Sequence, residues 1–407
     1  MQPFVSIILP VRNEEQYIVN CLDSIAAQDY PHDQMEILVV DGLSDDGTLD
    51  NIAEYDSRFD DIHIQEFTNP KQTVSAGLNI GFRRARGQVL IRMDAHARYG
   101  NDYISQCIKV MEKTGAANVG GPALALPGGP GLMAQAITLA HYSPFGLGGA
   151  QFRDPNAEGF VETVWPGCFK REVFDKIGYI DERRNRTEDI EFNSRLREAG
   201  YKIYLSPLIK AYYYCRTTLG ETWRQRWADG FEITRFLPDN PRAPRLRHFI
   251  PLLFVSSLIL LTALALTLAY SGQLAYSIQH IADSSGRLAL RMLVLELGAY
   301  LGAMLFFVGQ AGKTQLYNGH SKDKPSKEGG DTMGIPSENN GMSTVSPLCV
   351  NSITTVSQQY HNRSVKSTCS LLLLPLVFVT LHFSYGLGSL WGLISLPLMV
   401  NGKLKNR

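Results

Sequence analysis

The 407-residue chain lacks an excess of charge of either sign and a cysteine framework. Its 39 basic residues balance 39 acidic ones, so no overall electrostatic field favours a nucleic acid partner. The six cysteines show no CxxC or paired spacing, which argues against disulfides or a zinc knuckle and indicates a reducing compartment. A strand-like run begins at Phe4 with no basic region or cleavage site before it, so we expect no signal peptide.

The N-terminal half also lacks two common nucleotide-binding patterns. Neither GxGxxG nor GxxxxGK[ST] occurs there, which removes the main support for a dinucleotide-binding or P-loop protein. Apolar strand-like runs at residues 4–11, 35–40 and 89–93 instead alternate with stretches of helical spacing. This alternation predicts an α/β domain with a mainly parallel sheet covered by helices.

Polar side chains follow each of these strands. Asn13 and Glu14 follow the first, Asp41 ends the second, and Asp94 and His96 follow the third. The carboxyl ends of parallel strands form the edge of the sheet where ligands bind. Side chains two apart on an extended chain face the same side, so Asp94 and His96 could bind one metal ion. The alternative is a polar strand end whose aspartate caps the next helix.

The stretch DGLSDDGT, which begins at Asp41, is open to two interpretations. Ser44, Asp45 and Asp46 could simply cap the helix that follows. Asp41 could also accept a hydrogen bond from the imide N–H of a uracil.

Three apolar runs in the C-terminal part are long enough to cross a membrane: residues 249–270, 288–309 and 371–400. The second contains Arg291 and Glu296, and we expect Glu296 to face protein or headgroups because a charge in hydrocarbon is costly. The third contains Pro375 and several glycines, which suit a broken, re-entrant or hairpin segment better than one straight helix. We therefore expect a domain at 1–240 and a membrane region at 241–407.

The basic residues set the expected orientation. Arg242, Arg245 and Arg247 precede the first span, which predicts a cytoplasmic N-terminal domain on a multi-pass protein of the inner or plasma membrane. Residues 310–368 are rich in Gly, Ser, Asn, Lys and Pro, and we expect a mostly disordered inside loop there.

Four motifs occur in order over about residues 4–235: VSIILPVRNEE, VVDGLSDDGT, RMDAHARY and TEDIEFNSRLREAGYKI. Together they resemble the motifs of family 2 inverting glycosyltransferases with the GT-A fold. RMDAHA and the later HFSYGLGSLWGL are most similar to bacterial exopolysaccharide enzymes of the succinoglycan type. The resemblance implies a membrane-tethered transferase that moves a sugar from a nucleotide-sugar to a lipid-linked glycan on a polyprenyl diphosphate.

The resemblance assigns a donor site and a metal site by position. The residues matched to nucleotide-sugar binding are Pro10, Asn13, Glu14, Asp41, Lys71, Gly77, Asn79 and Asp94. Turn chemistry would also explain Pro10 and Asn13, and Lys71 could be a surface charge. Asp94 and His96 stand where the family places its Asp-x-Asp metal motif, which implies Mn²⁺ or Mg²⁺, with His96 favouring manganese.

Glu188 and Asp189 open a helix in TEDIEFNSRLREAG. In the family this aspartate is the general base, so Asp189 is the expected base and Glu188 its catalytic neighbour, with inversion of configuration. The alternative is that these carboxylates only stabilise a helix N-terminus.

Two further motifs match the acceptor side of the family. Trp165 and Gly167 lie in WPGCF, where the indole could stack on a sugar ring. Arg226 and Trp227 fit the Q/R-x-x-R-W motif of processive synthases, but Trp223 replaces its first residue, which favours single addition. An amphipathic helix at the membrane surface is the alternative for this motif. His382 could meet a lipid diphosphate or simply pack between helices.

Other functions stay open. A processive polysaccharide synthase or a polyprenyl-phosphate sugar transferase would keep the fold. A nucleotidyltransferase usually carries a basic, Gly-rich first loop, whereas PVRNEE is acidic. A non-enzymatic membrane scaffold would explain the departures at His96 and Trp223, but Asp41, Asp94 and Asp189 are all present.

Overall fold

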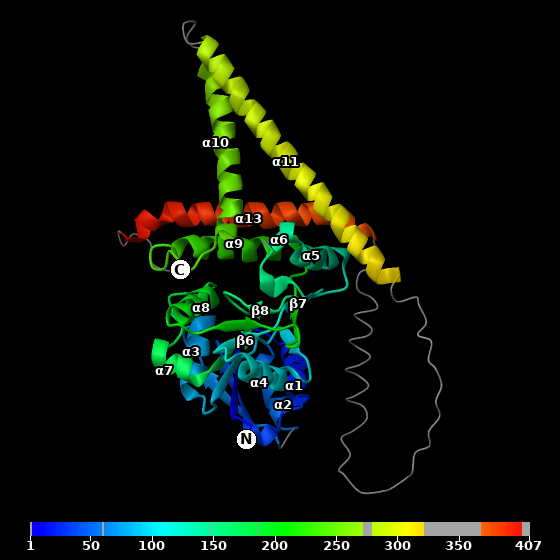
Figure 1. Cartoon of the computed structure of the whole chain (residues 1–407), viewed down its shortest axis with the longest axis vertical. Helices are drawn as coiled ribbons and strands as arrows, with labels where there is room; N and C mark the ends of the chain where they lie inside the picture. Colours follow the sequence, from blue (N-terminus) through cyan, green and yellow to red (C-terminus); the bar gives the residue numbers. More distant parts are fainter. Residues whose placement is uncertain are drawn as a thin grey trace.

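Strands and helices alternate through the N-terminal part of the chain, as the sequence predicts (Figure 1). The computed structural model describes residues 2–58, 61–147, 149–184, 186–271, 279–320 and 368–400. The first elements are β1 (Val5–Val11), α1 (Ile18–Ala26), β2 (Met35–Asp41), α2 (Thr48–Asp56), β3 (Ile64–Thr68), α3 (Val74–Arg84) and β4 (Val89–Arg92). They are followed by β5 (Ala97–Tyr99), α4 (Tyr103–Thr114), β6 (Asn118–Gly120), β7 (Ala123–Leu126), α5 (Leu132–Tyr142), α6 (Pro144–Leu147) and the 3-10 turn η2 (Gln151–Arg153). The domain ends with β8 (Gly159–Phe160), β9 (Cys168–Lys170), α7 (Arg171–Ile177), α8 (Glu188–Glu198), β10 (Ile203–Leu205), β11 (Ala211–Tyr214) and α9 (Leu219–Arg235).

Eight strands form one twisted sheet in the order β3-β2-β1-β4-β9-β6-β10-β8. The pairs β3/β2, β2/β1, β1/β4 and β6/β10 are parallel, while β9 and β8 pair antiparallel with their neighbours. A smaller sheet, β5-β11-β7, lies beside it. The chain reverses its strand order at β1, between β2 and β4, and a crevice forms at such a point. The predicted mainly parallel, helix-covered sheet is confirmed.

The alternation of side chains along the central strands explains the two helical layers. Ile7 and Leu9 of β1 are fully buried against helices α1, α2 and α4. Ile8, between them, points to the other face and is fully buried against α3, α7 and α8. Since β1 is apolar on both faces, the strand reads as a continuous hydrophobic run in the sequence.

Three long apolar helices follow the domain within the described residues: α10 (Ile250–Ser271), α11 (Gln279–His320) and α13 (Thr368–Val400). By length and composition each could cross a membrane. Glu296 of α11 faces α10, where Ser257 donates a hydrogen bond to its carboxylate. The expectation that Glu296 faces protein is therefore confirmed.

Two sequence expectations in this region were wrong. The segment 371–400 is one uninterrupted helix rather than a broken one, because its glycines lie in close contacts with neighbouring helices. The expected loop at 310–368 is wrong for residues 310–320, because α11 continues to His320. The remainder of that predicted loop, residues 321–367, lies outside the described residues.

Candidate active site

The loops after β1 and β2 are tied together at the carboxyl edge of the sheet. Asn13 has a φ of 55°, a left-handed conformation that asparagine tolerates better than most residues. Its side chain donates to Asp45 at 2.7 Å and accepts from the Asp45 backbone N–H at 3.0 Å. Asp41 is buried at the end of β2 and accepts the Ser44 hydroxyl at 2.6 Å. The predicted turn chemistry of Asn13 is thus present. The expected helix cap is not, since α2 has Gly47 at its N-cap without a capping side chain, although Asp46 accepts the Thr48 N–H at 3.0 Å.

Two other predicted donor residues, Pro10 and Gly77, lie at this edge. Pro10 lies near the end of β1, opposite Val40 of β2. Gly77 of α3 packs close by, since a Cβ at this position would lie 3.5 Å from Cβ of Pro10. Both therefore contribute backbone and shape to the wall of the crevice rather than charge.

Glu14 and His96 form a pair across this edge. The ring nitrogen Nδ1 of His96 lies 2.9 Å from Oε1 of Glu14. Burial lowers the pKa of His96, but the hydrogen bond and the charge of Glu14 outweigh burial and raise it. Because Nδ1 is engaged by Glu14, the other nitrogen, Nε2, is the one positioned to meet a ligand.

Asp94 belongs to a buried charge network centred on Arg92. The Arg92 guanidinium donates to Asp94 at 2.8 Å and to Glu188 of α8 at 3.0 Å. The Trp165 indole N–H donates to the second oxygen of Asp94 at 2.9 Å. Burial alone would raise the pKa of Asp94, but Arg92 holds it below its usual value, so the carboxylate is ionised at neutral pH.

Arg92 is a site residue that we did not single out from the sequence. Its signal was present in the RMDAHA motif, because side chains two apart on an extended strand share a face. Arg92 also joins the expected donor edge to the expected catalytic helix through Glu188. Gly167 holds this strand from the other side, since its carbonyl accepts the Arg92 backbone N–H at 3.0 Å.

Asp189 is half-buried at the first turn of α8. Burial and, second, the neighbouring Glu188 carboxylate raise the pKa of Asp189, and Arg92 opposes both, with a net pKa of about 7. Its Oδ1 accepts the Ile190 backbone N–H at 2.8 Å. A carboxylate that titrates near neutral pH is well matched to proton transfer, because a general base works best when its pKa lies near the operating pH.

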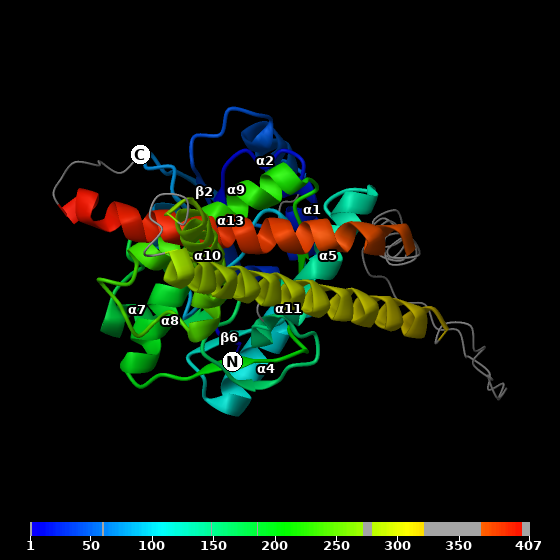
Figure 2. The ribbon, with the colours of Figure 1, turned by 90° about the horizontal axis from the view of Figure 1, so that it is seen from above.

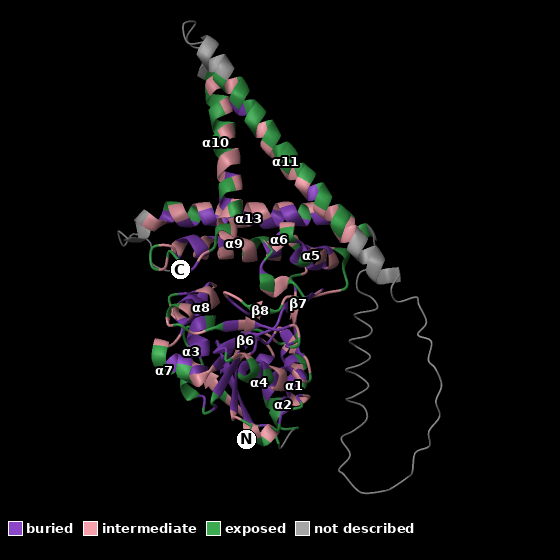
Figure 3. Cartoon of the chain, in the orientation of Figure 1, coloured by how far each residue is buried: buried purple, intermediate pink, exposed green. Residues whose placement is uncertain are grey.

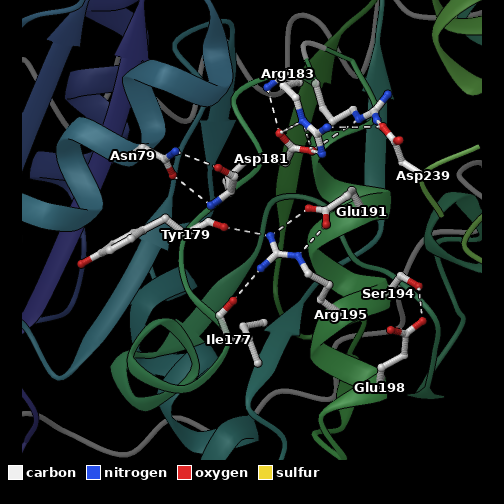
Figure 4. A network of polar contacts seen from close by, with 12 residues as sticks. Asn79, Ile177, Tyr179, Asp181, Arg183, Glu191, Ser194, Arg195, Glu198 and Asp239 are labelled. Atoms are coloured by element: carbon white, nitrogen blue, oxygen red, sulfur yellow. Dashed lines mark hydrogen bonds and ion pairs between the residues drawn. The ribbon is translucent and has the colours of Figure 1, made fainter. Parts of the chain in front are cut away.

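Arg195 anchors α8 (Figure 4), the helix whose first turn carries Asp189. Its guanidinium donates to the Ile177 carbonyl at 2.7 Å, to the Tyr179 carbonyl at 2.8 Å and to Glu191 of its own helix at 2.8 Å. The helix is thereby fixed to the segment that follows α7.

Asn79 and Lys71 do not join the other predicted donor residues. The Asn79 side chain is buried. It bonds the Ile180 backbone in both directions and donates to the Glu182 carboxylate at 2.9 Å. Lys71 pairs with the same Glu182 at 2.7 Å and is largely exposed. In this structure both residues hold the loop before α8.

A cavity of about 610 Å³ lies between the domain and the long helices. Asp189 lines it, together with apolar and aromatic side chains of α6, α10, α11 and α13. Its charged lining consists of Arg153, Arg186, Arg197, Arg226, Arg245, Arg247, Glu162, Asp189 and Asp229. Arginines outnumber carboxylates, so the cavity carries a surplus of positive charge.

Two arginines of the cavity share one aspartate, and a third arginine lies in the same cavity without an ion pair among the described residues. Asp229 pairs with Arg186 at 2.6 Å and with Arg226 at 2.7 Å. Arg153 forms no ion pair within the described part of the chain, and burial together with Arg226 lowers its pKa to about 10. Guanidinium groups in this arrangement suit a phosphate or diphosphate. Among the predicted acceptor residues, Arg226 lines the cavity, whereas the Trp227 backbone packs against α13.

The residues at the edge fit a divalent cation only in part. Across the described residues, no three or more His, Cys, Asp and Glu side chains surround one point. Asp94 and His96 nevertheless supply two suitable ligands, because Oδ1 of Asp94 accepts one hydrogen bond, from Arg92, and keeps a second lone pair, whereas Oδ2 accepts from both Arg92 and Trp165. Mg²⁺ and Mn²⁺ commonly take one or two protein ligands and complete their coordination with substrate phosphates and water. The pair therefore fits a phosphate-supported ion and not a closed protein cage.

Comparison with known proteins identifies the family. The Glycosyl transferase family 2 model matches residues 6–178. A glucuronosyltransferase of Methanococcus voltae, which acts on dolichyl N-acetyl-α-D-glucosaminyl phosphate, is 31% identical over 229 residues, covering 54% of this chain and 70% of its own. The chain belongs to glycosyltransferase family 2. This confirms the resemblance drawn from the four motifs.

Relatives of this family 2 glycosyltransferase include the succinoglycan biosynthesis protein ExoA of Rhizobium meliloti, which is 28% identical over 252 residues, 60% of this chain and 74% of its own. A mannosyltransferase of Pyrobaculum calidifontis, solved with GDP-Man and Mn²⁺, matches 96% of this chain and 88% of its own with a TM-score of 0.50 and 16% identity. The likeness in structure confirms the GT-A fold.

Proposed function

We propose that this glycosyltransferase moves a sugar from a UDP-sugar to a lipid-linked glycan acceptor during cell-surface polysaccharide biosynthesis, with inversion at the anomeric carbon. The observation that carries the proposal is the cavity that joins Asp189 to an arginine cluster and to the apolar helices α10, α11 and α13. A soluble sugar acceptor would not need the apolar walls, whereas a polyprenyl diphosphate needs both the arginines and the walls.

The donor would bind at the carboxyl edge of the sheet. Asp41 would accept the imide N–H of uracil, and the loop at Asn13 and Glu14 would cover the nucleoside. Asp94 and His96 would hold Mn²⁺ or Mg²⁺, whose charge stabilises the departing diphosphate. Arg92 keeps Asp94 ionised and oriented, since it donates to that carboxylate at 2.8 Å.

The reaction would be a direct displacement. Asp189 takes the proton from the acceptor hydroxyl, the freed oxygen forms the new bond at the anomeric carbon, and the bond to the β-phosphate oxygen breaks. Nucleoside diphosphate leaves from the face opposite to the attack, which inverts the configuration. The pKa of Asp189, about 7, supports this assignment because the base must be unprotonated before the step and protonated after it.

The acceptor lipid would enter from the membrane. Arg153, Arg186 and Arg226 would bind its diphosphate, and the aromatic walls would contact the first isoprene units. The names of two relatives support this substrate class, since one acts on a dolichyl phosphate sugar and the other serves succinoglycan biosynthesis. We further propose that residues 1–240 form a cytoplasmic domain and that helices of 241–407 attach it to the plasma membrane.

The test uses the full chain reconstituted in vesicles. Calorimetric titration with UDP, with and without Mn²⁺, should give manganese-dependent binding that Asp41→Ala and Asp94→Ala abolish. Asp189→Asn should bind UDP normally and transfer no sugar to a polyprenyl-diphosphate-linked acceptor. Full transfer by Asp189→Asn would overturn the base assignment. Equal rates with the lipid-linked sugar and the same sugar without lipid would overturn the acceptor assignment.

A further inference from the structure

Helix α13 lies across the other two apolar helices. In Figure 1 α13 runs horizontally while α10 rises vertically, and from above α13 extends across the molecule while α10 is seen nearly end-on (Figure 2). Its apolar window is 44% buried, against 11% for α10 and 6% for α11. Figure 3 shows the same contrast, since buried residues recur along α13, whereas α10 and α11 are mostly exposed or intermediate. Three helices of similar composition therefore have two different surroundings.

The first half of α13 packs on α5 and α6 of the catalytic domain. Its buried residues Leu374, Val377, Phe378 and Leu381 share one core with Ala136, Ile137 and Ala140 of α5. His382 closes this contact, because its Nε2 lies 2.6 Å from the Phe145 carbonyl and its Nδ1 lies 3.0 Å from the Tyr300 hydroxyl.

The second half of α13 packs on α9 through glycines. A Cβ added at Gly388 would collide with the Trp227 carbonyl, and one added at Gly392 would collide with Thr234. From the other side, a Cβ at Gly230 of α9 would collide with the Tyr385 carbonyl. Small residues spaced four apart allow two helix backbones to touch. Gly388 and Gly392 of the HFSYGLGSLWGL motif thus allow α13 to pack closely on α9.

Contact with α9 is incompatible with a membrane crossing. The α9 helix carries Arg224, Arg226, Asp229, Glu232 and Arg235, charges that hydrocarbon does not accommodate. Packed helices lie about 8–10 Å apart, whereas a crossing needs about 30 Å of depth. Because α5, α6 and α9 accompany α13 along most of its length, the helix stays at one level beside the domain.

The face of α13 away from the domain is apolar and faces the side from which α10 and α11 rise. Its exposed side chains are Cys369, Leu372, Leu376, Trp391 and Ile394. At 100° per residue these five fall within one face of about 100°, and Gly392, which packs on α9, lies on the opposite side of the helix. Between the two ends of this face α13 contacts α10. The ring centroids of Phe383 and Phe254 lie 5.8 Å apart, and Gly386 lies against Pro251.

We infer that α13 lies flat in the membrane interface with this face in lipid, and that among the described helices only α10 and α11 cross. The occupant of the face is lipid because α10 and α11 leave the molecule on that side. The inference depends on the membrane attachment proposed above and not on the sugar chemistry. Leu381, His382 and Tyr385 line the acceptor cavity, so a flat α13 places that cavity at headgroup depth.

The test measures depth and sidedness of nitroxide labels on the full chain in sealed phosphatidylcholine and phosphatidylglycerol vesicles, with the catalytic domain outside. Labels replace Leu372, Leu376 and Ile394 of α13, Leu260 of α10 as the deep reference and Leu208 as the outside reference. We expect equal shallow depths at the three α13 positions, and reduction of all three by external ascorbate.

A crossing α13 would place Leu372 and Ile394 about 33 Å apart along the bilayer normal. Ascorbate would then spare one of them, and Leu376 would lie about 6 Å deeper than Leu372, which would overturn the inference. A Leu260 label in water would instead refute the membrane attachment itself. Label depth and ascorbate reduction do not depend on transfer activity. Failure of the proposed function, which a transfer assay detects, is therefore distinguished from failure of this inference.

Discussion

Replacing Asp189 with asparagine should abolish transfer and at the same time stabilise the protein. The carboxyl has a pKa of about 7 in the folded chain against an ordinary value of 3.8. A displacement of this size corresponds to about 4 kcal/mol, and water reaching the half-buried side chain lowers the expected gain to about 1–3 kcal/mol. Asparagine keeps the oxygen that accepts the Ile190 N–H, so the change removes charge and little else.

The gain should depend on pH with a defined sign. Between about pH 4 and pH 7 the folded carboxyl holds a proton that the unfolded chain has released, so wild-type stability falls as the pH rises through this window. The advantage of Asp189→Asn should therefore be small near pH 4, grow to about pH 7 and stay constant above it. For a domain of this size it corresponds to about 2–10 °C in Tm at pH 8.

Thermal unfolding followed by tryptophan fluorescence, at pH 5 and pH 8, measures this difference. Glu188→Gln is the matched control, because it weakens the buried pair with Arg92 at 3.0 Å and should lower the Tm. A lower Tm for Asp189→Asn than for wild type at pH 8 would refute the reasoning.

Four other outcomes are expected from the same contacts. In pH–rate profiles, kcat should rise with pH and level off above an apparent pKa of about 7, and a flat profile would contradict Asp189 as the base. Arg153→Gln should raise the KM for lipid-linked acceptor about tenfold or more with the donor KM unchanged, since it removes a charged donor from the cavity. Glu14→Gln should weaken manganese-dependent UDP binding by about 10–100-fold in calorimetry, because it removes the charge that orients His96. Gly388→Leu should destabilise the protein by about 1–3 kcal/mol in thermal unfolding, whereas Gly298→Leu, where nothing lies within 4 Å, should not.

Much of the catalytic domain could be predicted from local pattern. The strands at 4–11 and 35–40 lie within one residue of β1 and β2, because strands apolar on both faces leave a run of hydrophobic residues that no other element produces at that length. Because parallel strands present their carboxyl ends at one edge of the sheet, the sequence also predicted that Asp41 and Asp94 lie at the same edge. Helix α8 begins at Glu188, as the TED motif predicts.

The sequence by itself determined the α/β order, the strand-end residues and the apolar character of the C-terminal helices, because each of these depends on residues close together in the chain. Only the tertiary structure decided which partners those residues meet. Asn79 and Lys71 bond Glu182, more than one hundred residues away, and Arg92 joins Asp94 to Glu188. The orientation of α13 also depends on the tertiary structure. Composition indicates how well a helix tolerates lipid, whereas packing against the charged helix α9 decides whether α13 can cross the bilayer.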